Sequence, residues 1–299
     1  MTIQMMTAPA ISVPSVSNAT MLIELSIGTW TGRKLDKQAS EEVTANKNAA
    51  KGVANVNKKL LGDCAELDAV NKFVANTRNT HYSSTVPWSD TGLRMVPTKR
   101  FPKYWEQMTG LQNEFGALVE TFLQAYDWEI SQAQVKLGDL FNPAEYPSVE
   151  KLRTKFRFNI NPIPLPEVGD WRVDMEKEAL DVVREHYEKF YDAQLKNAMG
   201  DVWDRTHKAL AKMSERLDYS DASTKKVFRD SLVENVMEVV DLLGDFNVTG
   251  DVQMTAMRDR LEDAMRGVTP EALREDEYLR QKTKHEVDAV LKSLPSLDI

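Results

Sequence analysis

The segment closest to a known chemical motif is the glycine-flanked stretch Gly28-Thr29-Trp30-Thr31-Gly32-Arg33-Lys34, which follows a strand-like run. A phosphate-binding loop has four residues between its glycines, and then Gly-Lys and a hydroxyl side chain for magnesium. Here three residues separate the glycines, and Leu35 stands where the hydroxyl would be. We interpret the stretch as a turn that ends a strand, and we expect no cofactor there.

Other residue types that support catalysis or metal binding lack the spacing that their chemistry requires. The four histidines are scattered, and His285-Glu286 lacks the second histidine of a zinc-protease helix. No serine stands in a Gly-x-Ser-x-Gly turn. One helical face carries four carboxylates without the Glu-x-x-His of a di-iron bundle, which favours a solvated face. These four are Asp181, Glu185, Glu188 and Asp192. The sequence therefore predicts a protein that is not an enzyme, with no catalytic, cofactor-binding or metal-binding residue.

The single cysteine and the hydropathy pattern indicate the compartment. Cys64 has no partner for an intramolecular disulfide and stands on an apolar seam, which predicts a buried, inert thiol in a reducing cytoplasm. No stretch reaches the roughly 18 apolar residues of a membrane helix. Residues 1–21 lack the basic start and apolar centre of a signal peptide. We expect a soluble cytoplasmic protein without membrane contact, and a flexible N-terminal arm over 1–21.

Charge is distributed unevenly along the chain. The net charge is −8, but residues 1–100 hold 12 Lys and Arg against 8 Asp and Glu, a balance of +4. Nucleic-acid binding needs a dense cationic face, because each phosphate contact replaces bound counterions. The negative net charge of the chain therefore argues against broad nucleic-acid binding, but it does not exclude a small basic patch.

Apolar spacing predicts two long helices after a short strand over 22–32. Apolar residues recur every three or four positions from Val53 to Val74 and again from Met108 to Ile130. The first seam predicts a helix over about 36–80, on the order of 65 Å long. The two helices would form an antiparallel hairpin of coiled-coil type. The alternative is that both seams face a globular core.

The remainder of the chain is predicted to be mostly helical. Asn142-Pro143 to Tyr146-Pro147 breaks the second helix, and Ser148 is a candidate N-cap for a short helix to Lys155. Residues 156–160 alternate as a strand, which the following prolines confine to a sheet edge beside the strand over 22–32. Helices are expected over 174–217, 224–243, 251–266 and 270–293, the last starting at Thr269-Pro270.

These elements predict a mainly α fold, with a long helical hairpin, a small β element and a C-terminal helical bundle. The expected divisions are a flexible arm (1–21), a strand plus hairpin (22–147), a short helix with a proline-rich connector (148–173) and a C-terminal helical region (174–299). A homo-oligomer is also expected, because long apolar helix faces often pack against those of a second copy of the chain.

The connection between the two predicted helices, over 81–105, is much longer than a simple hairpin needs. Aromatic and arginine side chains are typical of binding hot spots, and basic residues with aromatics also suit single-stranded nucleic acid. The alternative is a miniature core that locks the tip. The candidate partner-binding residues are Tyr82, Trp88, Arg94, Lys99, Arg100, Phe101, Lys103, Tyr104 and Trp105.

Three blocks of the sequence resemble a domain-of-unknown-function family of tailed phages and prophages. They are Thr85-Val86-Pro87-Trp88-Ser89-Asp90-Thr91-Gly92-Leu93-Arg94, Tyr146-Pro147-Ser148 through Phe156-Arg157-Phe158, and Thr269-Pro270-Glu271-Ala272-Leu273-Arg274. The resemblance implies a mostly helical bacteriophage protein in the host cytoplasm with no assigned activity. Its members are encoded near MoxR-like AAA+ ATPases, which makes such an ATPase a candidate partner.

Two functions follow as expectations. The first is a non-enzymatic adaptor or scaffold that presents the 81–105 tip to a protein partner or assembles with itself. The second is an accessory protein that binds single-stranded nucleic acid through its basic N-terminal third.

Overall fold

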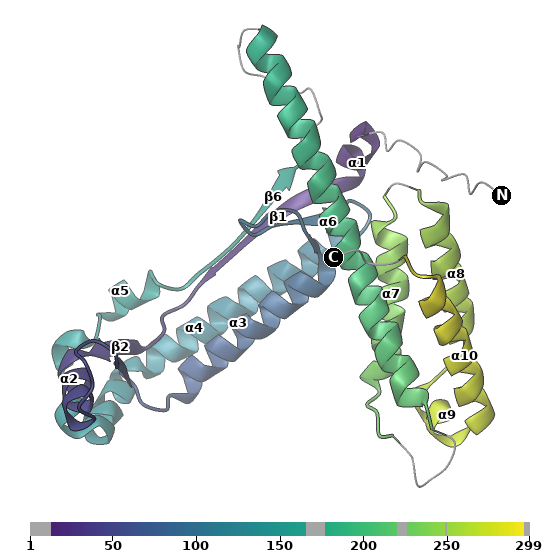
Figure 1. Ribbon diagram of the computed structural model, residues 1–299. Helices are drawn as coiled ribbons and strands as arrows, with labels where there is room; N and C mark the ends of the chain where they lie inside the picture. Colours follow the sequence, from purple (N-terminus) through teal and green to yellow (C-terminus); the bar gives the residue numbers. More distant parts are fainter. Residues whose placement is uncertain (1–12, 166–176, 220–225, 249, 296–299) are drawn as a thin grey trace. The chain divides into compact units, whose positions relative to one another are not determined.

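The computed structural model describes residues 13–165, 177–219, 226–248 and 250–295 (Figure 1). The chain divides into two compact units. The bundle unit contains Met1–Glu24, Ser84–Lys103 and Pro162–Ile299, and the helix-pair unit contains Leu25–Ser83 and Tyr104–Asn161. Within the described residues no helix is both long and apolar enough to cross a membrane.

The helix-pair unit is built mainly on two helices, α3 (Ala65–Ser84) and α4 (Phe101–Leu137). They lie side by side in Figure 1 and run antiparallel, because Cys64 lies close to Glu129 at one end and His81 contacts Tyr104 at the other. Their facing sides are apolar at steps of three, four and seven residues, as helical periodicity requires. The buried apolar side chains are Leu67, Val70 and Val74 of α3, and Met108, Phe115, Val119, Phe122, Leu123, Tyr126 and Ala133 of α4.

The predicted single helix over 36–80 is wrong. The structure has α2 (Lys37–Asn46), strand β3 (Val56–Lys59) and then α3, and β3 pairs antiparallel with β2 (Arg33–Asp36). The backbone takes positive φ at Asn48 (50°), Gly52 (87°) and Gly62 (64°), which no α-helix accommodates. The helical pair is therefore shorter than predicted on the α3 side, and its coiled-coil character stays a prediction.

Residues after α4 close the far end of this unit. Two short 3-10 turns, η1 (Gly138–Leu140) and η2 (Pro143–Glu145), follow α4 and lead to α5 (Val149–Arg153). Ser148 caps α5, as predicted, by accepting the Lys151 N–H. Helix α4 ends at Leu137, before the predicted break at Asn142-Pro143, and Gly138 directly after it takes a positive φ of 51°.

A four-stranded sheet has the order β4-β5-β1-β6, and the division between the two units falls inside β1 and β6. Its strands are β1 (Thr20–Gly28), β4 (Val86–Pro87), β5 (Leu93–Pro97) and β6 (Arg157–Pro164). The predicted neighbours, the N-terminal strand and the strand at 156–160, are adjacent, and the proline-containing β6 is an edge strand. Strand β6 continues to Pro164, past its predicted end. Strand β5, which pairs antiparallel with β1 from Thr20↔Pro97 to Glu24↔Leu93, was not predicted.

The bundle unit contains α6 (Lys177–Leu217), α7 (Ser231–Phe246), α8 (Val252–Met265), α9 (Pro270–Glu275) and α10 (Glu277–Ser293). Helix α6 packs on α7 and α10, and α8 packs on the same two helices (Figure 1). Helix α7 carries a continuous buried face at helical spacing, with Leu232, Val236, Val239, Leu243 and Phe246. The predicted mainly α class is therefore confirmed.

Helix boundaries in the bundle unit agree with the sequence where a capping residue defines them. Thr269 accepts the Ala272 N–H with Pro270 in the first turn, as predicted. The predicted last helix is interrupted, however, because Asp276 ends α9 and caps α10 through the Leu279 N–H. Helix α7 starts at Ser231, since residues 226–230 are not helical, and its predicted start at 224 lies outside the described residues. The predicted start of α6 at 174 lies outside the described residues.

The N-terminal segment differs in part from the predicted flexible arm. Residues 13–19 form α1 (Val13–Ala19), and Val16 is fully buried in the core of the bundle unit. The Thr20 hydroxyl donates to the Val16 carbonyl at 2.7 Å, which joins this helix to β1. The part of the predicted arm at 1–12 lies outside the described residues.

Candidate functional site

The predicted partner-binding residues are divided between the two units, and Trp88 lies in the core of the bundle unit. Its side chain is 4% exposed, and its ring makes an edge contact with Tyr191 at 5.2 Å between centroids. The indole therefore contributes packing to the main core of this unit, which differs from a separate miniature core of the 81–105 segment, and presents almost no surface to a partner.

Arg94 is held by protein acceptors in the same unit. Its Nε donates to the Thr85 hydroxyl at 2.7 Å and its Nη2 donates to the Thr85 carbonyl at 2.8 Å. Arg205 donates to the same carbonyl at 3.0 Å and pairs with Asp201 at 2.7 Å. Burial raises the pKa of Asp201 even though Arg205 and Arg94 oppose this shift. Arg94 therefore belongs to a partly buried polar network that fixes the start of β4.

The other predicted partner-binding residues of the bundle unit are more accessible than Trp88. Lys99 and Arg100 face Asp245 of α7 at 3.7 and 3.6 Å, and the Lys99 side chain is 79% exposed. Phe101 is half-buried and Lys103 is exposed, both in the first turn of α4. The ion pair of the exposed Lys99 contributes little to stability, so Lys99 remains available for other contacts, whereas the Arg100 and Asp245 side chains are only 22% and 23% exposed.

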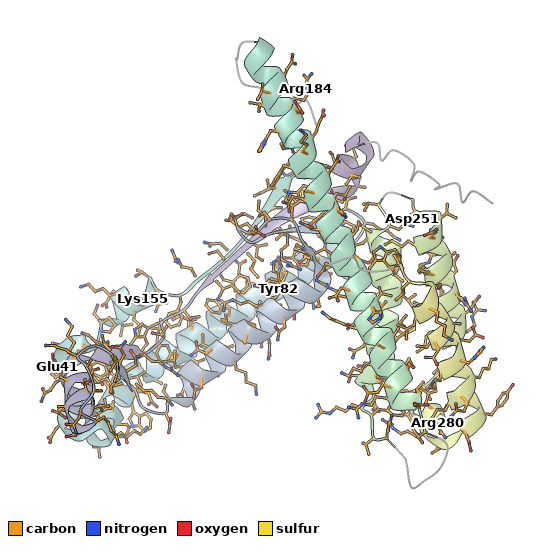
Figure 2. All side chains as sticks on the ribbon, in the orientation of Figure 1. Glu41, Tyr82, Lys155, Arg184, Asp251 and Arg280 are labelled. Atoms are coloured by element: carbon orange, nitrogen blue, oxygen red, sulfur yellow. The ribbon has the colours of Figure 1, made fainter. Side chains whose placement is uncertain are left out.

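Tyr82, Tyr104 and Trp105 belong to the helix-pair unit. Tyr104 is 2% exposed, and its hydroxyl oxygen lies 2.8 Å from His81 Nδ1. The His81 ring lies 5.6 Å from the Tyr82 ring, and Tyr82 stands in the last turn of α3, where Figure 2 labels it. Tyr82 is 48% exposed and Trp105 is 36% exposed. We call these two side chains the Tyr82–Trp105 surface.

A buried lysine that the sequence did not single out organises the other end of the helix-pair unit. Lys58 lies 3.1 Å from Asp36 and 2.9 Å from Glu145, and it donates to the Leu140 carbonyl at 2.8 Å. Burial opposes the charged form of Lys58, but the bonds to Glu145 and Asp36 outweigh it and raise its pKa. The Ala39 N–H, and then Lys58, hold the pKa of Asp36 below its usual range. This cluster joins β2, β3, η1 and η2. The residues that Lys58 contacts in η1 and η2 are too distant in sequence for these contacts to be predicted.

Cys64 is buried, as predicted, but it is not isolated. Among the described residues, one group of three or more His, Cys, Asp or Glu side chains could hold a metal ion, and it consists of Cys64, Glu66 and Glu129. Each offers one potential ligand atom, and the three atoms lie within 4.8 Å of one another. Burial raises the pKa of Cys64 to about 11, and the nearby Glu129 and Glu66 charges act in the same direction. The sequence carried one signal of this group, since Glu129 stands on the apolar face of α4 between Tyr126 and Ala133.

The chain matches no protein-family model, no curated protein and no solved structure. The resemblance to the phage family remains an expectation that three sequence blocks carry.

Proposed function

We propose that the protein is a non-enzymatic interaction protein, an adaptor or scaffold that binds a protein partner through the Tyr82–Trp105 surface. The observation that carries the proposal is the exposure of two large aromatic side chains beside a buried, hydrogen-bonded pair. Tyr82 follows His81 directly and Trp105 follows Tyr104 directly, and His81 and Tyr104 contact each other. Both aromatic residues therefore stand at the same end of the α3–α4 pair.

Aromatic side chains in this setting are suited to binding. Tyrosine and tryptophan dominate hot spots because they bury a large area with few rotatable bonds. A support of two packed helices lowers the ordering cost, because the backbone beneath the aromatics is already fixed. Exposed Lys99 and Lys103 in the bundle unit give the protein separate cationic positions that would favour an acidic partner.

The family resemblance supplies the first partner to test, a MoxR-like AAA+ ATPase. Affinity purification of the tagged chain from its native or infected cells, followed by mass spectrometry, identifies what the protein binds. Recovery of such an ATPase, or of another defined protein, supports an adaptor. Recovery of the chain alone as a discrete larger species supports a self-assembling scaffold.

The Tyr82–Trp105 surface is tested on the identified partner with the double variant Tyr82→Ala/Trp105→Ala. We expect the Kd to rise at least tenfold, which corresponds to about 1.4 kcal/mol. Trp128→Ala is the matched control, because Trp128 is 61% exposed and lies on the same helix α4. Equal affinities for the wild type, the double variant and the control would show that this surface is not the binding site.

Nucleic-acid binding is the alternative, and the contacts of its arginines do not favour it. Arg94 donates to Thr85, and Arg100 faces Asp245. Fluorescence anisotropy with a labelled single-stranded oligonucleotide at low salt separates the two functions. Binding that weakens steeply with salt would support the alternative and count against a protein partner.

A further inference from the structure

We propose that Cys64, Glu66 and Glu129 bind a divalent cation of the zinc type at the start of α3 in the helix-pair unit. Cys64 immediately precedes α3, and its carbonyl accepts the Asp68 N–H at 3.1 Å. Glu66 stands in the first turn of α3, and Glu129 comes from the facing part of α4. The three potential ligand atoms lie within 4.8 Å of one another.

Glu129 supplies the observation that points to a ligand. Glu129 is 4% exposed, and its Oε2 has no hydrogen-bond partner. A buried carboxylate oxygen without a donor is costly, and such a group is normally paired with a cation or bound to a metal. A Glu129 carboxylate oxygen lies within 4.8 Å of the Cys64 sulfur and of a Glu66 carboxylate oxygen. Neither group neutralises the Glu129 charge, and a bound cation would.

The spacing of the other two ligands suits a shared metal ion. The Cys64 Sγ lies 3.6 Å from Glu66 Oε2. Zinc–sulfur and zinc–oxygen bonds of about 2.3 and 2.1 Å at a tetrahedral angle place sulfur and oxygen about 3.6 Å apart. The pair therefore has the separation that coordination needs. The Glu129 oxygen lies within 4.8 Å of the other two ligand atoms, so a side-chain movement of at most about 1.2 Å brings it to such a separation.

The donor set selects the class of metal. One thiolate with two carboxylates suits zinc and its substitute cobalt, whereas magnesium and calcium take oxygen ligands alone. On binding, the thiol proton of Cys64 leaves to solvent and sulfur becomes a thiolate ligand. Water can complete the coordination, because Cys64 also lines a small cavity of about 100 Å³ beside Asp68 and Asn71.

The location implies a structural role for the metal. It would join the start of α3 to α4 at one end of the helical pair, as the His81–Tyr104 contact joins the two helices at the other end. Metal binding to the folded form alone stabilises that form by RT ln(1 + L/Kd), where L is the metal concentration, so the stabilisation rises with the logarithm of that concentration above the Kd. The inference does not depend on the proposed partner, since it concerns metal affinity and helix stability only.

Cobalt substitution tests the site directly, because the chain contains one cysteine. The untagged full chain, stripped of metal with a chelator, is titrated with Co²⁺ and its absorption spectrum is recorded. We expect a near-ultraviolet sulfur-to-cobalt charge-transfer band that saturates at one equivalent and disappears on addition of Zn²⁺. Cobalt binding without this band, or no binding, would overturn the proposal, since no other thiolate is present.

Two variants test the thiolate and the buried carboxylate as ligands, with the Zn²⁺ Kd measured by competition with a chromophoric chelator. Cys64→Ser and Glu129→Gln should each raise the Kd at least tenfold and abolish the rise in Tm that Zn²⁺ gives the wild type. Glu114→Gln is the control, because Glu114 is an exposed carboxylate on the same helix. Glu129→Gln is nearly isosteric and removes a buried charge, so its fold should persist in the absence of metal. A Glu129→Gln variant with wild-type zinc affinity would refute the site.

Discussion

His81 Nδ1 lies 2.8 Å from the Tyr104 hydroxyl oxygen, and both side chains are buried where the end of α3 meets the start of α4. The two rings are 6.0 Å apart and tilted, so the contact combines a hydrogen bond with aromatic packing. This pair stands at the same end of the two helices as the Tyr82–Trp105 surface, because each exposed aromatic residue follows one member of the pair in sequence.

Tyr104→Phe should lower the free energy of unfolding by about 1 kcal/mol, because it removes this buried hydrogen bond and keeps the ring. Urea denaturation measured by circular dichroism gives the value. Tyr278→Phe is the matched control, since Tyr278 is 79% exposed, and its stability should equal that of the wild type. Equal effects of the two substitutions would contradict a structural role for the contact.

Lys58→Met should destabilise the protein by about 3 to 5 kcal/mol, because the substitution leaves two carboxylates facing each other without their cation. The Asp36 and Glu145 side chains are each only 13% exposed, so solvent replaces the lost ammonium group poorly. Lys59→Met provides the control on the adjacent residue, whose side chain is 56% exposed, and should change stability by less than about 0.5 kcal/mol. Thermal and urea denaturation of the two variants distinguish them, and similar losses would argue against the buried cluster.

Acid should weaken the same end of the helix-pair unit through Asp36. Its folded-state pKa is lowered, first by the Ala39 N–H and then by Lys58, so the unfolded chain takes up the proton first as the pH falls. The stabilisation is complete above the unfolded pKa of about 3.9 and is lost as the pH falls through the lower folded value. Asp36→Asn should show a smaller loss of stability below about pH 4 than the wild type. Urea denaturation over a pH series measures this difference, and parallel profiles would contradict it.

Two glycine-to-alanine substitutions should change stability in opposite directions. Gly32 has φ +62°, and a Cβ there would lie 2.8 Å from Leu67 Cδ2, so Gly32→Ala should cost about 1 to 2 kcal/mol. Gly116 stands inside α4, with no atom within 4 Å of an added Cβ, so Gly116→Ala should stabilise by about 0.5 to 1 kcal/mol. Differential scanning calorimetry gives both values. A stabilising Gly32→Ala would show that the turn after β1 tolerates a side chain.

Local signals in the sequence predicted the helical class and several boundaries. Ser148 and Thr269 act as N-caps because their side chains accept N–H groups only three residues away. The prolines of β6 indicated an edge strand because each lacks a backbone donor. The predicted turn at 28–34 lies between two strands, since β1 ends at Gly28 and β2 begins at Arg33, but its last two residues belong to β2.

Local spacing was misleading where distant partners determine the structure. The apolar positions between Val53 and Cys64 fit a helix, but the pairing of β2 with β3 and the contact of Lys58 with Glu145 favour an extended segment there. Aromatic composition singled out the 81–105 segment without showing which rings are buried. Trp88 packs against Tyr191, about a hundred positions along the chain, whereas Tyr82 and Trp105 remain exposed.

The sequence by itself therefore determined a mainly α chain, its capped helix starts, its edge strand and a buried cysteine, because each depends on neighbours within a few residues. Only the tertiary structure decided which aromatic side chains stay exposed and which charged groups meet in the interior. Glu129 shows the reason most clearly: its helical position was evident from the sequence, but its proximity to Cys64 and Glu66 arises from the antiparallel packing of α3 on α4. Contacts between residues far apart in sequence depend on that packing, which no short-range pattern encodes.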